Sequence, residues 1–317
     1  MKNILIRVDS SFDIGTGHVM RDLVLATQYP HDNIIFYTQK LKGNINQKIQ
    51  EHDYKIHIAH SHDIIELIEY INFNYIDLLI IDHYGIDYKF EKTLKEKTGI
   101  EIMVLDDTYE AHYCDILLNH NIYADHKKYQ NLVPKYCQIR CGANYTLLRD
   151  EFLNIKSVKK IDRAKRLKIF MAMGGADSKY MNIALLEKLK SLSIDIELVA
   201  THANKNLEEL KKYVAQHNMI KLHIDSKNIA NIICRCNLAI VTPSVMVNEI
   251  IFLKIPFISV MVTDNQYYMD KFLKQQGFPC IDSSELYLIP SLIEKFRDLN
   301  YYTQQLKQID TIVSKGI

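Results

Sequence analysis

The chain has 317 residues, a formal net charge of +1, 48% hydrophobic residues and 24% charged residues. This length suggests two domains of ordinary size, each able to bury its own core. The near-zero charge argues against duplex nucleic acid as a partner, the apolar runs are too short to cross a membrane, and no secretory signal is visible. The six cysteines lack paired C-x-x-C spacing, which disfavours a zinc site and indicates reduced thiols in a cytoplasmic protein.

The first half of the chain alternates short β-branched runs with longer helical patterns, as βαβ units do. The pattern predicts strands at Ile4–Val8, Ile34–Tyr37, Lys55–Ile58, Asp77–Ile81, Glu101–Leu105, Ile116–Leu118 and Cys137–Cys141. It predicts helices at His18–Gln28, Asp63–Asn72 and Lys89–Lys97. The run Leu78–Ile81 is apolar throughout, which is typical of a parallel strand covered by helices on both faces.

A strongly basic stretch with little apolar periodicity, residues 154–166, interrupts this pattern. It could contact phosphate, but a solvated linker is the favoured interpretation. A second series follows, with strands predicted at Leu167–Met173, Ile194–Ala200, Ile220–Ile224, Leu238–Val241 and Phe257–Val262 and a last helix at Asn300–Ser314. We therefore predict an N-terminal domain at 1–153, a linker at 154–166, a C-terminal domain at 167–299 and a C-terminal helix at 300–317.

The predicted fold class is α/β, with two doubly wound Rossmann-like domains and a cleft between them. In open parallel sheets, ligands bind beyond the carboxyl ends of the strands. The residues that carry chemistry should therefore follow the strands directly.

The turn after the first strand contains Gly15 and Gly17 and leads into a helix that begins near His18. Glycines let the backbone approach an anion closely, and a helix N-terminus presents free N–H groups to it. His18 could simply cap the helix, but its place beside the glycines favours a catalytic base.

Polar side chains also follow the next two central strands of this half. Asp82, His83 and Tyr84 form either part of a site or a helix cap with two exposed rings. Asp106 and Asp107 resemble a metal-binding pair, but they lack Asp-x-Asp spacing, so capping is favoured.

The second half opens with a similar turn, Met173-Gly174-Gly175, whose amides could cradle a diphosphate. Further along, Ser244 could cap a helix and leave the Val245 N–H free for a phosphate.

Two further positions could recognise the rest of a nucleotide sugar. Glu249 could accept hydrogen bonds from both ribose hydroxyls, although a surface glutamate is the simpler interpretation of this residue alone. Asn265 and Gln266 could read sugar hydroxyls or acetamido groups.

Together these stretches resemble the UDP-2,4-diacetamido-2,4,6-trideoxy-β-L-altropyranose hydrolases of pseudaminic acid biosynthesis, within the glycosyltransferase-B superfamily. The resemblance extends through most of the chain and rests on Arg7–Ser11, Gly15–His18, Arg21–Ala26, Ile80–Gly85, Cys114–Asn119, Arg140–Gly142, Tyr145, Leu148–Phe152, Met173–Asp177 and Val247–Glu249. It implies a two-domain glycosyltransferase-B fold, no metal and no cofactor. It also implies hydrolysis of the C1–O bond with inversion, which supplies a sugar for flagellin glycosylation.

Carried over by position, the catalytic histidine of the family falls on His18, its active-site tyrosine on Tyr84 and its ribose-binding glutamate on Glu249. One departure is the turn Thr242–Met246, where relatives usually have a small Ser-rich turn. The expected partners are a UDP-sugar and water, and we expect a monomer. The predicted substrate-binding residues are Asp9, Gly15, Gly17, His83, Met173, Gly174, Gly175, Asp177, Ser244, Val245, Asn248, Glu249, Asn265 and Gln266.

Two alternatives remain at this point. A sugar transferase of the same fold would require an acceptor, and a nucleotide-sugar sensor would bind without turnover. Release of free sugar in the absence of any added acceptor separates the hydrolase from both.

Overall fold

The computed structural model describes residues 1–155, 166–177 and 179–314. The chain divides into two compact units, Met1–Leu147 (unit 1) and Leu148–Ile317 (unit 2). Most of the basic stretch predicted to be a linker, residues 156–165, lies outside the described residues. Arg149, which the sequence-based boundaries assign to the first domain, belongs to unit 2.

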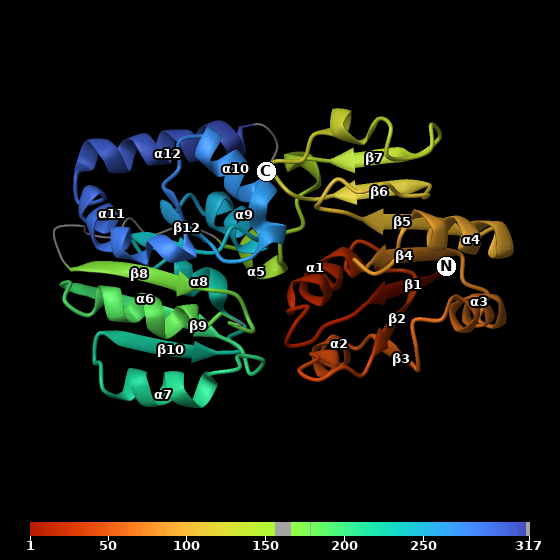
Figure 1. Cartoon of the computed structure of the whole chain (residues 1–317), viewed down its shortest axis with the longest axis horizontal. Coiled ribbons are helices and arrows are strands. Elements are labelled where there is room, and N and C mark those ends of the chain that lie inside the picture. Colours follow the sequence, from red (N-terminus) through yellow and green to blue (C-terminus); the bar gives the residue numbers. More distant parts are fainter. Residues whose placement is uncertain (156–165, 178, 315–317) are drawn as a thin grey trace. The chain divides into compact units, whose positions relative to one another are not determined.

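Unit 1 contains a sheet of seven parallel strands in the order β3-β2-β1-β4-β5-β6-β7 (Figure 1). The strands are β1 Asn3–Val8, β2 Asn33–Gln39, β3 Lys55–Ala59, β4 Leu78–Asp82, β5 Glu101–Leu105, β6 Ile116–Asn119 and β7 Gln138–Cys141. The helices are α1 Gly17–Ala26, α2 Asn46–Glu51, α3 Ile64–Phe73 and α4 Tyr88–Thr98, with 3₁₀ turns η1 His126–Tyr129 and η2 Ala143–Tyr145.

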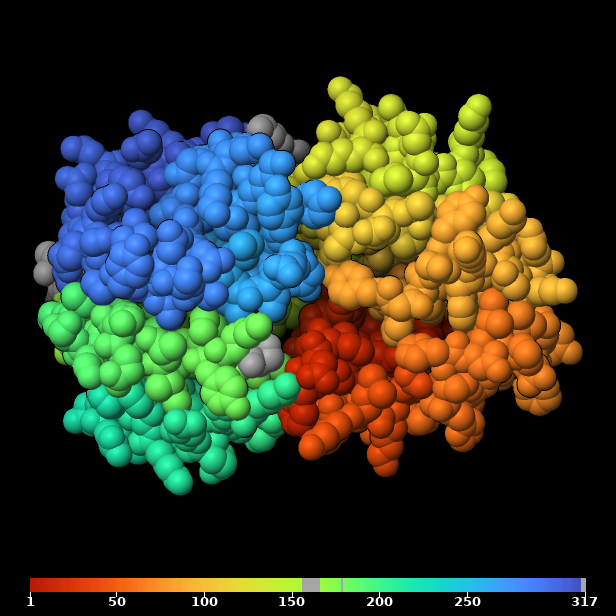
Figure 2. Space-filling model, viewed as in Figure 1, coloured from red at the N-terminus to blue at the C-terminus, as the bar shows by residue number. Residues whose placement is uncertain are grey.

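Alternate side chains of the central strands of unit 1 pack on opposite faces of the sheet. Leu78 and Ile80 of β4 join one buried cluster, which includes residues of α1, whereas Leu79 and Ile81 join another, which includes residues of α3 and α4. Both faces are therefore covered, as the apolar run predicts. In the space-filling view, the colours of unit 1 run from red and orange at one end to yellow at the other, as the strand order requires (Figure 2).

Unit 2 contains six parallel strands in the order β10-β9-β8-β11-β12-β13. The strands are β8 Leu167–Ala172, β9 Ile194–Ala200, β10 Ile220–Ile224, β11 Leu238–Val241, β12 Phe257–Met261 and β13 Cys280–Asp282. The helices are α5 Asp150–Leu153, α6 Met181–Leu189, α7 Leu207–Ala215, α8 Ile229–Ile233, α9 Val245–Phe252, α10 Tyr267–Gln275, α11 Ile289–Lys295 and α12 Leu299–Val313, with 3₁₀ turns η3 Asp264–Gln266 and η4 Ser283–Leu288.

The two parallel sheets and their alternating helices confirm the predicted fold class, and the observed strands match the predicted ones to within about two residues at either end. The short edge strand β13 and the helix α2 are additions that the sequence patterns did not predict. Within the part of the chain that is described, none of the helices combines the length and apolar character needed to cross a membrane.

Candidate active site

The carboxyl ends of β1 and β4 meet at the centre of the unit 1 sheet. Strand β1 pairs with β2 on one side and with β4 on the other, and Val8 lies opposite Asp82. The chain therefore reverses its winding direction between these two strands, and ligands of doubly wound sheets bind at such a switch point. The turn that leads to His18 and the polar residues that follow β4 are brought together at this edge.

His18 and Asp82 are in direct contact at this edge. His18 Nδ1 lies 2.5 Å from Asp82 Oδ1, and both side chains are buried. Because an ionised carboxylate only accepts hydrogen bonds, Nδ1 carries the proton in this contact and Nε2 is left as the basic nitrogen. Asp82 is therefore part of the site, and the alternative that it caps the next helix is wrong, because Asp87 caps α4.

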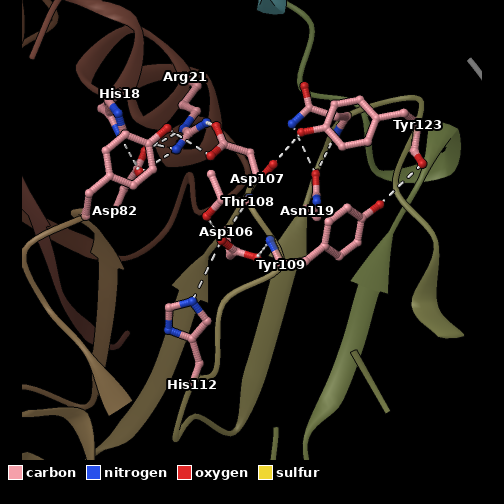
Figure 3. A network of polar contacts seen from close by, with 12 residues as sticks. His18, Arg21, Asp82, Asp106, Asp107, Thr108, Tyr109, His112, Asn119 and Tyr123 are labelled. Atoms are coloured by element: carbon pink, nitrogen blue, oxygen red, sulfur yellow. Dashed lines mark hydrogen bonds and ion pairs between the residues drawn. The ribbon is translucent and has the colours of Figure 1, made fainter. Parts of the chain in front are cut away.

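Arg21 connects Asp82 to a second carboxylate (Figure 3). Its Nε and Nη2 donate to the two oxygens of Asp82 at 2.6 and 2.5 Å, and its Nη1 donates to Asp107 Oδ2 at 2.7 Å. Burial alone would raise the pKa of the Asp82 carboxyl, but the charges of Arg21 and His18 outweigh it and hold that pKa well below its usual range. Asp82 therefore stays ionised beside the imidazole.

Tyr84 closes the network from the other side. Its hydroxyl donates to Asp107 Oδ1 at 2.9 Å, and its ring meets the His18 ring edge-on, with centroids 4.7 Å apart. Tyr84 is 53% exposed, whereas His18 is 8% exposed, so the tyrosine forms the open side of this cluster. The two residues predicted to be catalytic are thus in contact.

A third carboxyl group of this region, Asp22, lies on α1. It is fully buried, and neither of its oxygens has a hydrogen-bond partner among the described residues. Burial, together with the nearby negative charge of Asp82, raises the pKa of Asp22 well above its usual value. Burial and the charge of Asp82 thus favour the protonated form of Asp22, unlike that of Asp82.

Asp106 and Asp107 do not cap a helix, contrary to the sequence-based interpretation. Asp106 accepts hydrogen bonds from the backbone of Thr108 and Tyr109 and from the Tyr129 hydroxyl, and so fixes the turn after β5. This turn carries Asp107 toward Arg21. The tight turn explains the error, because an Asp that closes a turn has the same local pattern as an Asp that caps a helix.

Asp9 and His83 lie beside this network but are satisfied within the protein. Asp9 accepts from Arg7 at 2.8 Å, from the Gln39 N–H at 2.7 Å and from His83 Nε2 at 3.2 Å. His83 Nδ1 accepts from the Gly85 N–H at 2.9 Å. Both residues therefore hold the edge of the sheet in place. Direct substrate contacts were predicted for them, but both ring nitrogens of His83 already have partners and the Asp9 carboxylate is buried.

Asp9, His83 and His62 are also close enough together to hold a metal ion. However, Arg7 Nη2 lies 2.8 Å from Asp9 Oδ2 and 2.9 Å from His62 Nδ1, which places a fixed positive charge against two of the three candidate ligands. His83 Nε2 carries a proton, because its Nδ1 accepts from Gly85. This donor set fits a hydrogen-bonded cluster better than a cation site.

The predicted glycine turn before α1 has the conformation that its sequence implies. Gly15 has φ +86°, a left-handed conformation that favours glycine. Gly17 is the exposed first residue of α1, and a side chain at either glycine would point into open space. Thr16 occupies the N-cap position without a side-chain hydrogen bond, so His18 is not the helix cap.

The same topological device recurs in unit 2. Strand β8 pairs with β9 on one side and β11 on the other, which places Met173, Gly174 and Gly175 near the turn that follows β11. Gly174 is exposed and has φ +85°, whereas Met173 is buried. Asp177 is buried and accepts from the N–H groups of Met181 and Asn182, so it holds the start of α6.

The turn after β11 differs from its prediction in one respect. Ser244 occupies the N-cap position of α9 as predicted, but its side chain makes no capping hydrogen bond. Val245 is the first residue of α9, and the first N–H groups of this helix have no side-chain cap. Asn248 is fully buried, and its amide group lacks a partner among the described residues.

Glu249 is already engaged within unit 2. Arg149 Nε and Nη2 donate to its two carboxylate oxygens at 2.6 and 2.8 Å, and Arg149 also pairs with Glu151 at 2.8 Å. Burial raises the pKa of Glu249, and the charge of Arg149 opposes that effect. Each oxygen retains a lone pair, so a ribose hydroxyl would share this carboxylate with Arg149.

Asn265 and Gln266 lie in η3, directly after β12. Gln266 Oε1 accepts from the N–H groups of Val262 and Thr263, which leaves its NH₂ group to donate elsewhere. Asn265 is exposed, and its Oδ1 accepts from the Thr263 hydroxyl at 2.6 Å. The amide N–H groups of both side chains are the donors that remain.

Arg21, Asp107 and Arg149 were not predicted as site residues. Arg21 follows His18 by three positions on the same helix, which places the two side chains on one face, and this spacing was the available signal. Asp107 pairs with Arg21 and Arg149 pairs with Glu249. These partners are far apart in the sequence, so no local pattern indicates either pair.

The two parallel sheets and their alternating helices define a two-domain glycosyltransferase-B fold. Solved structures support the fold: MurG of Acinetobacter baumannii has a TM-score of 0.64 at 13% identity, covering 98% of this chain and 95% of that one. Anabaena Alr3699/HepE in complex with UDP-glucose has a TM-score of 0.62 at 10% identity, covering 99% and 95%.

Sequence comparison is more specific. The chain is 39% identical over 275 residues to the UDP-2,4-diacetamido-2,4,6-trideoxy-β-L-altropyranose hydrolase of Campylobacter jejuni, covering 87% of this chain and 97% of that protein. An uncharacterised protein of Methanocaldococcus jannaschii is 29% identical over 271 residues, which cover 80% of this chain and 54% of that protein. No family model matches the chain. The chain belongs to the family of UDP-2,4-diacetamido-2,4,6-trideoxy-β-L-altropyranose hydrolases.

Proposed function

We propose that this chain is an inverting hydrolase that cleaves UDP-2,4-diacetamido-2,4,6-trideoxy-β-L-altropyranose into UDP and the free diacetamido sugar. Membership of the family supports the substrate. The observation that carries the chemistry is the 2.5 Å contact between His18 Nδ1 and Asp82, because it leaves His18 Nε2 as a free base at the switch point of unit 1.

In the proposed reaction a water oxygen donates a lone pair to the anomeric carbon, and its proton passes to His18 Nε2. The C1–O bond breaks, and its electron pair stays on the β-phosphate oxygen of UDP. Attack from the face opposite the phosphate inverts the anomeric configuration. The imidazolium that forms faces Asp82, whose negative charge stabilises it.

The residues of unit 2 are proposed to bind UDP. Backbone amides of Gly174, Gly175 and Val245 would donate to the diphosphate and neutralise the charge that develops on it. Glu249 would accept hydrogen bonds from the ribose, and the free amide N–H groups of Asn265 and Gln266 would contact the sugar. These groups need no metal and no cofactor, so we expect hydrolysis to continue in the presence of EDTA.

The same proposal places the reaction in pseudaminic acid biosynthesis, where the free sugar is consumed for flagellin glycosylation. We assign it to the cytoplasm and to a monomer, since its substrate is a nucleotide sugar and its chemistry requires one copy of each named residue.

The test is hydrolysis in ¹⁸O-labelled water without any acceptor. We expect the label in the sugar and none in UDP, because water attacks carbon rather than phosphorus. His18→Asn should lower kcat by roughly 10²–10⁴-fold, the usual contribution of a general base, while UDP still binds. Near-normal turnover of this variant would exclude His18 as the base, and a strict requirement for an acceptor would identify a transferase instead.

A further inference from the structure

The direction of the Tyr84 hydroxyl is set by its partner. Tyr84 donates to Asp107 Oδ1 at 2.9 Å, while Asp107 Oδ2 accepts from Arg21 at 2.7 Å. A carboxylate paired with a guanidinium offers only lone pairs. The Tyr84 proton is therefore committed to Asp107, and the phenol oxygen has only lone pairs left to offer.

The neighbouring imidazole is arranged in the same way. The Nδ1 proton of His18 is committed to Asp82, so Nε2 also presents a lone pair. One side chain, Arg21, binds both carboxylates and so fixes both hydrogen-bond directions. The cluster thus presents two acceptors, on rings that touch edge-on with centroids 4.7 Å apart.

A water molecule matches two acceptors, because it has two O–H bonds. With hydrogen bonds of ~2.8 Å, one water spans acceptors roughly 5 Å apart. When both O–H bonds point at the two rings, a lone pair of the water oxygen is left to point away from them. A sugar hydroxyl, by contrast, has a single O–H bond and would occupy one acceptor only.

We infer that Asp107 is a positioning residue that makes Tyr84 an acceptor for the nucleophilic water. His18 takes the proton that is transferred, and Tyr84 holds the second O–H bond, which stays intact and becomes the anomeric hydroxyl of the product. This inference rests on the proposed hydrolysis. It adds that Tyr84 orients the water rather than binding the sugar.

Asp107→Asn tests the inference because its amide can reverse the hydrogen bond. The Asn oxygen can still accept from Arg21, while its NH₂ donates to the Tyr84 oxygen and occupies the lone pair meant for water. We expect kcat to fall about tenfold, as for the loss of one hydrogen bond, with KM within twofold of the native value. Tyr84→Phe should behave alike, and the double variant should be no slower than Tyr84→Phe alone.

A matched control is Asp310→Asn, which removes the exposed ion pair between Asp310 and Lys254 (2.7 Å) on a helix that the mechanism does not use. Its kcat should be native. The inference would be overturned if the losses in kcat of the two single variants multiplied in the double variant. It would also be overturned if Asp107→Asn had native turnover, or a higher KM without a lower kcat. If His18→Asn is inactive while Asp107→Asn is normal, the proposed function stands and only this inference fails.

Competition between water and methanol gives a readout that is independent of the folding of Asp107→Asn. Methanol has one O–H bond, so it uses His18 but gains nothing from Tyr84. In dilute methanol, Tyr84→Phe should therefore raise the ratio of methyl glycoside to free sugar about tenfold over the native enzyme. An unchanged ratio, or no methyl glycoside at all from the variant, would contradict the inference.

Discussion

At the level of single residues, Asp82 decides which nitrogen of His18 carries the proton. The amide introduced by Asp82→Asn would keep its oxygen on Arg21 Nε, lose the hydrogen bond from Arg21 Nη2, and turn an NH₂ donor toward Nδ1. The imidazole would then carry its proton on Nε2 and could not accept one from water. We expect kcat to fall by roughly 10²–10⁴-fold with little change in UDP affinity, measured by steady-state kinetics and calorimetry.

Asp22→Asn on the same helix separates this effect from a general loss of packing. Neither carboxyl oxygen of Asp22 has a hydrogen-bond partner among the described residues, so this substitution should leave the tautomer of His18 unchanged and cost far less activity than Asp82→Asn. If Asp82→Asn turns over at a near-native rate, Asp82 does not control the base.

The residues of the site differ in how far the sequence could predict them. His18 was recognisable because two glycines and a helix start surround it. The role of Asp82 was ambiguous, because its partner His18 lies 64 positions away, and only the pairing of β1 with β4 brings them together. Asp107 was misinterpreted as a cap for the same reason, since Arg21 is 86 positions away.

At the level of elements, the loop after β5 is tied to helix α4 by a buried histidine. His112 Nδ1 lies 2.7 Å from Glu91 of α4, and its Nε2 lies 3.9 Å from Asp106. Burial alone would lower the pKa of His112, but Asp106 and Glu91 outweigh it and raise the pKa from 6.5 to about 9. The loop that carries Asp107 is therefore anchored by a charged imidazole.

This anchor predicts a pH dependence of stability. Because the pKa of His112 is higher in the folded state than in the unfolded state, its contribution is fully present below pH 6.5 and is lost as the pH rises through about 9. The shift corresponds to about 3 kcal/mol. The free energy of unfolding of the native protein, relative to His112→Gln, should fall by up to this amount over that range.

Urea unfolding at several pH values measures this difference, and proton NMR of the His112 ring measures its titration directly. If the free energies of unfolding of the native protein and His112→Gln differ by the same amount at every pH from 6 to 9.5, the loop is not held by the charge on His112.

Elements with strong local patterns were predicted well, and those without them were not. Strand β4 begins with the apolar run Leu78–Ile81. Helix α4 has Asp87 as its N-cap and Gly99, with φ +68°, as its C-cap, so each element has a clear sequence pattern. Strand β13 has only the three residues Cys280–Asp282 at the edge of a sheet. Its identity as a strand comes from pairing with β12, which no local pattern encodes.

At the level of the whole molecule, the two units repeat one device: a parallel sheet whose winding reverses beside its first strand, at β1 and β4 in unit 1 and at β8 and β11 in unit 2. The alternation of strands and helices was enough to predict two doubly wound sheets. The order of the strands in each sheet could not be predicted from local sequence patterns, because β1 pairs with β4 across more than 70 residues.

The proposed division of labour between the units can be tested on the complete chain by hydrogen exchange. UDP alone should protect the amides of 173–175 and the start of α9 in unit 2, because these groups are assigned to the diphosphate. Protection of the segments around His18 and Tyr84 should require the sugar, supplied as intact UDP-sugar to the His18→Asn variant. When the free ligand concentration is about 100 times Kd, amide exchange that occurs only from the unbound protein can slow by about 100-fold.

Glu249→Gln provides the control, because it removes the charge proposed to bind ribose while leaving unit 1 untouched. The unit 2 amides of this variant should need a higher UDP concentration for the same protection. In the native chain, 2′-deoxy-UDP should protect these amides less well than UDP. In the variant, the two nucleotides should protect them equally. If the variant still distinguishes the two nucleotides as strongly as the native chain, Glu249 does not contact the 2′-hydroxyl and serves only to hold Arg149. If UDP protects only the segments of unit 1, the nucleotide and the sugar have been assigned to the wrong units.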